Sequence, residues 1–239
     1  MINQKSSITK DEKAKDQSRK NGIIVGSLFL FVFVCSLLGT SLVEEVMFAD
    51  NYLQTAHLHQ NQWILGLIIH LCSVAATIFI AVMMFPMLKA QSVRFAIGYL
   101  IFRTLEALTF TIMESNGLSV LILSQEFIKS GSADLANFEL MGSIVQQSRT
   151  HFYEIGVIFF CIASLMFYFS MFKSKILPTY ITTWGLTGAT LALIMMIMSL
   201  FGIELSAMQS IILAAPIALN EIYMSIWLII FGFRPIKAA

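Results

Sequence analysis

Residues 93–113, which read VRFAIGYLIFRTLEALTFTIM, decide the fold of this chain. A bilayer core about 30 Å thick requires about 20 apolar residues in a helix, since each residue adds about 1.5 Å. The part from 95 to 113 meets that length, and lipid forces a helix because an open strand could not satisfy its backbone polar groups there. The run nevertheless contains Arg103 and Glu106, which share one helix face because they are three residues apart.

Apolar runs of similar length occur throughout the sequence and set the fold class. Hydrophobic residues make up 57% of the chain and charged residues 12%, against about 25% charged residues in a soluble domain. The mean hydropathy is +0.80. The six predicted spans are residues 23–43, 63–87, 95–113, 152–172, 182–201 and 211–233. We therefore predict an all-α, polytopic transmembrane bundle of six helices, with the lipid bilayer as its partner.

The distribution of lysine and arginine predicts the orientation. Cytoplasmic segments of membrane proteins carry the excess of basic residues. In this chain those residues concentrate before the first span, between spans two and three, between spans four and five, and after the last span. Both termini are therefore predicted to be cytoplasmic. Residues 1–22 form a polar basic segment, which predicts a disordered tail, residues 23–233 the membrane domain, and residues 234–239 a short cytoplasmic tail. Basic residues cluster only in the first segment, which argues against nucleic-acid binding.

The long outer connection before the fourth span has a helical pattern of its own. Leu135, Phe138, Met141 and Val145 recur at helical spacing after a Gly-Ser start. This pattern predicts an amphipathic helix that lies against the outer side of the bundle and leads into span four.

Ionisable residues inside the spans are the candidate functional groups. Each costs about 2.5 to 3.5 kcal/mol near the bilayer centre, so it persists when it is paired, hydrated or functional. Arg103 and Glu106 lie near mid-depth in span three, and Glu221 lies at a similar depth in span six, five residues after Pro216. Span two contributes His70, and span four begins with His151. These five residues are Arg103, Glu106, Glu221, His70 and His151. We predict that they line a polar cavity that is closed toward the cytoplasm and open to the outer side.

Other interpretations of these residues stay open at this point. Arg103, Glu106 and Glu221 could form an ion-paired cluster that only fixes span three to span six. Glu114, at the end of span three, could be a solvated helix-end acid. His70, His151 and Glu154 could instead hold a zinc ion, although zinc requires three or four ligands that converge in space. The residues alone indicate no cofactor. The sequence contains no GxSxG motif, no glycine-rich phosphate loop and no HExxH motif. Whether the protein is an enzyme therefore stays undecided. The oligomeric state stays undecided too.

Four short segments carry a resemblance to a known family. They are FRTLEA in span three, RTHFYEIGVIFF at the start of span four, SKILPTYITTWGLTGA before and within span five, and NEIYMSIWLIIFG in the last span. Together with the six-span layout, they resemble a bacterial membrane family catalogued as a domain of unknown function, number 4386. The resemblance implies a multi-pass protein of the bacterial plasma (inner) membrane and supplies no established activity.

The function predicted from the residues is therefore that of a binding or conducting membrane protein. A small polar or anionic ligand, or protons, would reach the charged cluster from the outer side. Arg103 would be the charge-compensating cation, Glu106 and Glu221 its partners or the proton carriers, and His70 and His151 hydrogen-bonding or titrating groups. The alternatives are a membrane-embedded, metal-dependent hydrolase that acts on a lipid or peptide, and a purely structural ion-paired bundle.

Overall fold

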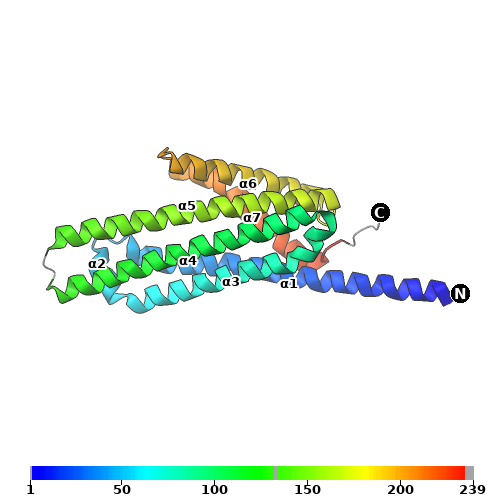
Figure 1. Cartoon of the computed structure of the whole chain (residues 1–239), viewed down its shortest axis with the longest axis horizontal. Coiled ribbons are helices and arrows are strands. Elements are labelled where there is room, and N and C mark those ends of the chain that lie inside the picture. The colour runs from blue at the N-terminus through cyan, green and yellow to red at the C-terminus, as the bar shows by residue number, and fades with distance from the viewer. Residues whose placement is uncertain (1, 132–133, 235–239) are drawn as a thin grey trace.

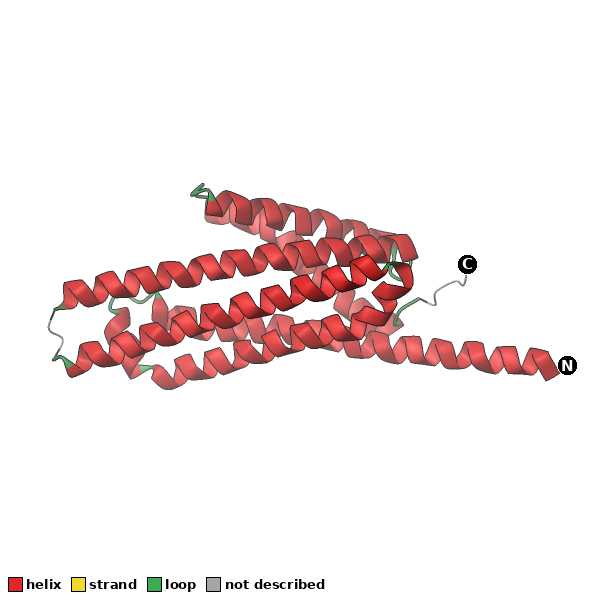
Figure 2. Ribbon diagram, in the orientation of Figure 1, coloured by secondary structure: helices red, strands yellow, loops and turns green. Residues whose placement is uncertain are grey.

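The computed structural model describes residues 2–131 and 134–234, and its regular secondary structure is entirely helical within these ranges (Figure 2). The helices are α1 (Ile2–Met47), α2 (Tyr52–Leu58), α3 (Gln60–Gln91), α4 (Val93–Lys129), α5 (Leu135–Ser174), α6 (Thr179–Leu200) and α7 (Ala207–Phe231). Six of them, all except α2, are long and apolar enough to cross a membrane. The predicted all-α bundle of six spanning helices is confirmed, and the chain is a multi-pass membrane protein.

The six spanning helices form a ring. Each packs mainly against two neighbours, in the order α1, α3, α4, α5, α6, α7 and back to α1, and a smaller contact joins α3 to α5. Figure 1 shows the long helices running in roughly the same direction along the molecule. Helices on opposite sides of the ring, such as α4 and α7, are not neighbours. Inward-facing side chains of the spanning helices can therefore meet in the middle of the ring.

The start of α1 and the end of α7 lie at the same end of the bundle (Figure 1). There the Ser18 hydroxyl donates a hydrogen bond of 2.9 Å to the carbonyl oxygen of Phe233. We call this the terminal end, and the opposite end, which carries the short helix α2, the α2 end. Six crossings require both termini to be on one side of the membrane, and their assignment to the cytoplasm stays a prediction.

Helix α1 is longer than predicted. It begins at Ile2, so the segment 2–22, predicted to be a disordered tail, continues the first spanning helix and projects beyond the bundle (Figure 1). Lysine, glutamine and alanine are good helix formers, and extension of an existing helix avoids the cost of nucleation. In this part of α1, Lys20 and Asp16 are one turn apart and form an ion pair of 2.8 Å. Of the predicted C-terminal tail, residues 235–239 lie outside the described residues.

Helices α4 and α5 extend beyond the thickness of a membrane at the α2 end. They contain 37 and 40 residues, which corresponds to about 55 and 60 Å, against about 30 Å for the bilayer core. The amphipathic segment predicted before span four is helical, but it forms the first turns of α5 rather than a separate helix. The predicted long outer connection is therefore mostly helix, and α2 packs there against α4.

A pair of glycines brings α1 and α3 close together. A Cβ atom at Gly39 would lie 2.7 Å from the carbonyl oxygen of Gly66, and one at Gly66 would lie 2.8 Å from that of Gly39. Small residues at such contacts let membrane helices approach closely, which maximises their van der Waals packing. The contact also places α1 against His70, whose backbone nitrogen would lie 2.8 Å from a Cβ at Gly39.

We predict that Gly39→Leu lowers the thermal stability of the purified protein. The leucine side chain would have to displace the α3 backbone, and overpacking of this kind typically costs about 1–3 kcal/mol. The melting temperature in detergent measures the effect. Leu38→Ala is the matched control, because Leu38 is 50% exposed and its truncation leaves the α1–α3 contact intact. Equal melting temperatures for Gly39→Leu and the wild type would contradict the packing role.

Candidate functional site

A cavity of about 410 Å³ lies in the interior of the ring. Residues from α1, α3, α4, α5 and α7 line it. They are Phe29, Val32, Phe33, Ser36, Leu37, Thr40, Glu44, His70, Arg103, Glu106, Phe110, Tyr153, Val157, Phe160, Ala218 and Glu221. Of the five residues predicted to line one cavity, the structure brings four together: Arg103, Glu106, Glu221 and His70. His151 is not among the lining residues.

Arg103 and Glu106 form a buried ion pair within α4. The distance from Arg103 Nη1 to Glu106 Oε2 is 3.0 Å, and the two side chains are 4% and 5% exposed. The pair follows from their i, i+3 spacing, which places both on the inner face of the helix. The centre of the Arg103 guanidinium also lies 5.5 Å from the centre of the Phe160 ring on α5, within the range of a cation–π contact.

Glu221 lines the cavity from the opposite side, on α7. The sequence predicted it, with Glu106, as a partner of Arg103, and the structure places it in the same cavity without a direct ion pair. Among the described residues, Glu221 forms no ion pair, and the ion pair of Arg103 is with Glu106. The reason is the ring arrangement, which separates α4 from α7 and leaves the cavity between them.

His70 connects the cavity to a second polar group nearer the α2 end. Its Nδ1 atom lies 2.7 Å from Oε1 of Glu114 on α4. Its ring also contacts the Phe110 ring, with 5.7 Å between the ring centres. Because Nδ1 of His70 is engaged by Glu114, Nε2 is the ring nitrogen left for other partners. The tautomer of His70 depends on whether the proton between the two residues sits on Nδ1 or on Oε1 of Glu114.

Glu114 is buried rather than solvated, contrary to the interpretation considered from the sequence. It is 2% exposed, and its Oε1 atom lies 3.5 Å from Nη2 of Arg149 on α5, which is itself buried. One carboxylate therefore links α3, α4 and α5. Sequence reasoning missed Arg149 because it assigned the segment from about Gly117 to Thr150 to an outer connection. Its position two residues before His151, at the start of an apolar helical run, is the signal that could have found it.

His151 and Glu154 form a separate pair on α5. His151 Nδ1 lies 3.0 Å from Glu154 Oε2, and the His151 side chain is 63% exposed. Glu154 also accepts a hydrogen bond from the Ser199 hydroxyl on α6. Among the described residues, no three histidine, cysteine, aspartate or glutamate side chains form a group that could hold a metal ion. The alternative zinc ligands, His70, His151 and Glu154, are therefore not brought together.

Aromatic residues pack against one another on the terminal side of the charged groups. Tyr99, one turn before Arg103 on α4, lies 5.7 Å from the Phe167 ring on α5. The Phe167 ring lies 6.2 Å from Phe29 on α1 and 5.1 Å from Tyr168. All four are buried and belong to the main hydrophobic core. These rings pack beside Arg103 and Glu106, and the closure of the cavity on that side stays a prediction.

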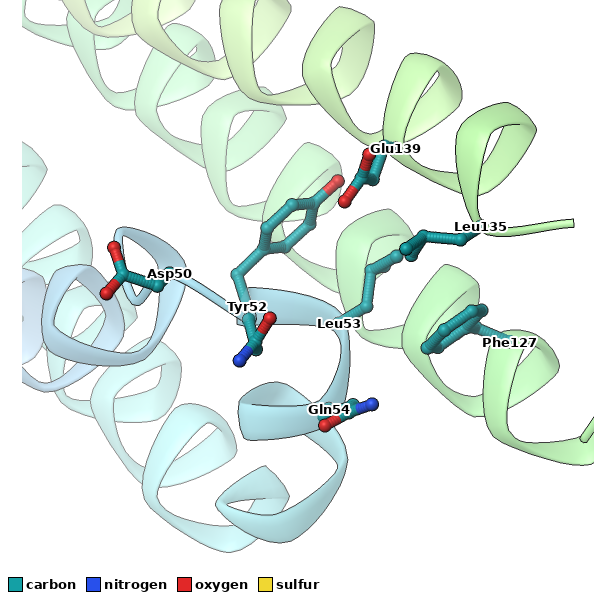
Figure 3. A pocket seen from close by; sticks show the side chains of 8 residues that line it. Asp50, Tyr52, Leu53, Gln54, Phe127, Leu135 and Glu139 are labelled. Atoms are coloured by element: carbon teal, nitrogen blue, oxygen red, sulfur yellow. The ribbon is translucent and has the colours of Figure 1, made fainter. Parts of the chain in front are cut away.

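A smaller cavity of about 140 Å³ lies at the α2 end, between α2 and the extended parts of α4 and α5 (Figure 3). The Tyr52 hydroxyl points toward Glu139 in this cavity (Figure 3). Burial, and then the nearby Glu139 carboxylate, raise the pKa of the Tyr52 hydroxyl. The phenol therefore stays neutral at physiological pH. No residue predicted as a site from the sequence lines this cavity.

Comparison with known proteins identifies the family of the chain. Residues 24–232 match the family described as Domain of unknown function (DUF4386). The match covers most of the sequence, so the chain belongs to this family, in agreement with the resemblance seen in its short segments. No curated protein and no solved structure matches the chain. The functional assignment therefore depends on the geometry of the site.

We predict that Glu114→Ala strongly destabilises the bundle. The change leaves the buried Arg149 guanidinium without its carboxylate and removes the hydrogen bond of His70. Removal of one partner from a buried charge pair typically costs about 3–5 kcal/mol. Thermal unfolding in detergent measures the loss.

The matched control for this prediction is Glu126→Ala on the same helix. Glu126 forms an ion pair of 2.7 Å with Lys129, in which both side chains are more than half exposed. Exposed pairs contribute at most about 1 kcal/mol, so we expect little change in the melting temperature. Similar losses in both variants would show that Glu114 does not link the helices as described.

Proposed function

We propose that this member of the DUF4386 family binds a small polar ligand or protons in the central cavity, with Glu221 as the carboxyl group that exchanges a proton or meets the ligand. The observation that carries the proposal is the charge balance of the cavity. Three carboxyl groups line the cavity. Glu44 is exposed near the end of α1, whereas Glu106 and Glu221 lie with the single guanidinium, Arg103, in the middle of a membrane-spanning ring.

The charge balance gives Glu221 its distinct role. Arg103 lies 3.0 Å from Glu106 and can neutralise that carboxylate, which leaves Glu221 without an ion-pair partner among the described residues. An isolated carboxylate in a medium of low dielectric constant is costly. Glu221 is therefore suited to hold a proton, or to meet a ligand that brings a positive charge or hydrogen-bond donors. A neutral or cationic ligand fits this balance better than an anion, which would add negative charge beside two carboxyl groups.

The size and walls of the cavity suit a small molecule. Ligand sites in proteins commonly measure about 300–1,000 Å³ and have mostly apolar walls with a few polar groups that fix orientation. Here the volume is about 410 Å³, and phenylalanine, valine, leucine and tyrosine side chains surround Arg103, Glu106 and Glu221.

Access to the cavity is proposed from the α2 end, between α1 and α5. Both helices contribute residues to the cavity wall, but they do not pack against each other in the ring. Leu37 on α1 is 61% exposed and Tyr153 on α5 is 45% exposed, and Glu44 lines the cavity near the end of α1. The proposal identifies this end with the outer side of a bacterial plasma membrane. The basic residues near the termini and the family resemblance support that orientation and location.

The two alternative functions receive less support from the geometry. The Arg103–Glu106 pair is within a single helix, so it cannot fix α4 to α7 as a structural pin. The links between helices are formed instead by Glu114 with His70 and Arg149. A hydrolase that uses His70, His151 and Glu154 would need these side chains to meet around one metal ion, and His151 pairs with Glu154 away from the cavity.

We predict that Glu221→Gln abolishes the response of the cavity to protons and amines. Proton flux into liposomes that contain the wild-type protein and a trapped pH-sensitive dye, driven by a potassium diffusion potential, should fall at least about tenfold in the variant. In parallel, n-butylamine should raise the melting temperature of the wild type, while butyrate should not, because only the amine complements Glu221. Arg103→Ala should alter the response as well, since Glu106 then loses its counter-charge and the cavity becomes more negative.

Glu204→Gln is the matched control, because Glu204 is an exposed acid in the connection between α6 and α7. This variant should behave like the wild type in both assays. If Glu221→Gln and Arg103→Ala fold and respond like the wild type in both the flux and the amine measurement, the cavity is not the functional site.

A further inference from the structure

Close packing does not explain why position 117 on α4 is a glycine. A Cβ atom placed on it would meet no atom closer than 3.6 Å, which is an ordinary van der Waals contact. Gly39, Gly66 and Gly188 differ, because a Cβ there would lie within 2.7 or 2.8 Å of backbone on the neighbouring helix. Alanine would also favour the helix over glycine at this buried position. The space above Gly117 therefore requires an explanation of its own.

Three polar atoms surround that space at nearly equal distances. From the position of a Cβ on Gly117, the distance is 3.6 Å to Arg149 Nε, 3.6 Å to Trp63 Nε1 and 3.7 Å to Glu114 Oε2. The three residues come from three different helices and are 5%, 0% and 2% exposed, respectively. None of the three atoms has a hydrogen-bond partner among the described residues.

Unpartnered polar groups at this depth are costly. A buried donor or acceptor without a hydrogen bond costs about 1–3 kcal/mol, and more when it is charged. Two of the atoms carry N–H donors and the third is a carboxylate acceptor. A ligand that satisfies all three must accept two hydrogen bonds and donate one, which is what a water molecule does. Buried waters typically make about three hydrogen bonds to such groups.

We propose that Gly117 leaves room for one buried water molecule, which accepts hydrogen bonds from Trp63 Nε1 and Arg149 Nε and donates one to Glu114 Oε2. An inorganic anion fits less well, because Glu114 would repel it. A metal ion fits less well too, because the two N–H groups offer it no lone pair. The other oxygen of Glu114 binds His70, so the water completes the network that orients His70 in the cavity wall. The proposal is independent of what the cavity binds.

The melting temperature of Gly117→Ala tests the proposal, because an empty space and a water-filled space change it in opposite directions. An empty space would be filled by the methyl group, and the gain in helix propensity would raise the melting temperature. If water occupies the space, the methyl group expels it and strands three polar atoms, so we expect the melting temperature to fall by at least about 2 °C. Gly117→Ser is the rescue variant, because its hydroxyl can replace the water. It should melt above Gly117→Ala, although serine is the poorer helix former.

A second measurement reads the site directly. In protein labelled with ¹⁵N in its tryptophan indoles, the Trp63 N–H signal, assigned from the Trp63→Phe variant, should show magnetisation transfer from a long-lived water in the wild type. The transfer should disappear in Gly117→Ala, while the Trp184 and Trp227 signals stay unchanged. Replacement of chloride by gluconate in the buffer should leave the melting temperature unaffected.

Three results would overturn the proposal. The first is a higher melting temperature for Gly117→Ala than for the wild type. The second is the lack of water transfer to Trp63 in the wild-type protein, a measurement that stands even if the variants fail to fold. The third is a chloride-dependent melting temperature that disappears in Gly117→Ala, which would assign the site to an anion.

Discussion

The Glu114 carboxylate joins three of the six spanning helices, and much of the polar interior depends on it. Its Oε1 atom lies 2.7 Å from His70 Nδ1 on α3 and 3.5 Å from Arg149 Nη2 on α5. Lipid offers no substitute for such a partner, since a polar group in the hydrocarbon region must be satisfied within the protein. Loss of the carboxylate would affect the position of His70 and the packing of α3, α4 and α5 together.

The interior of the ring contains two polar groups with different roles. The group around Glu114 and Arg149 is buried and linked across helices, which are the properties of a structural anchor. The group around Arg103, Glu106 and Glu221 lines a cavity and contains one carboxyl more than it has cations. His70 belongs to both groups, because it lines the cavity and also binds Glu114. A change in the cavity can therefore reach the anchor through one imidazole ring.

The hydrophobic periodicity of the sequence and the depth of each residue within its predicted span were enough to predict the features that lie within a single helix. Six spans follow from the apolar runs, and the Arg103–Glu106 pair follows from its i, i+3 spacing. The shared cavity of His70, Arg103, Glu106 and Glu221 also followed from their similar depths. What one sequence could not supply was the order of helices around the ring. That order determines why Glu221 faces Arg103 across a cavity rather than in an ion pair, and why Arg149 meets Glu114. The lengths of α4 and α5 were also missed, because polar residues beyond the bilayer hid the continuing helices.

Those lengths have a mechanical consequence. Helix α4 carries Arg103 and Glu106 at the cavity, then Glu114 at the anchor, and ends at Lys129, about 40 Å beyond Arg103. No proline interrupts this helix, so it runs without a break from the cavity charges to its end beyond the bilayer core. A tilt of a few degrees at the cavity becomes a displacement of several ångströms at the far tip. A change in the orientation of α4 at the cavity would therefore move the part of the helix that extends beyond the bilayer core.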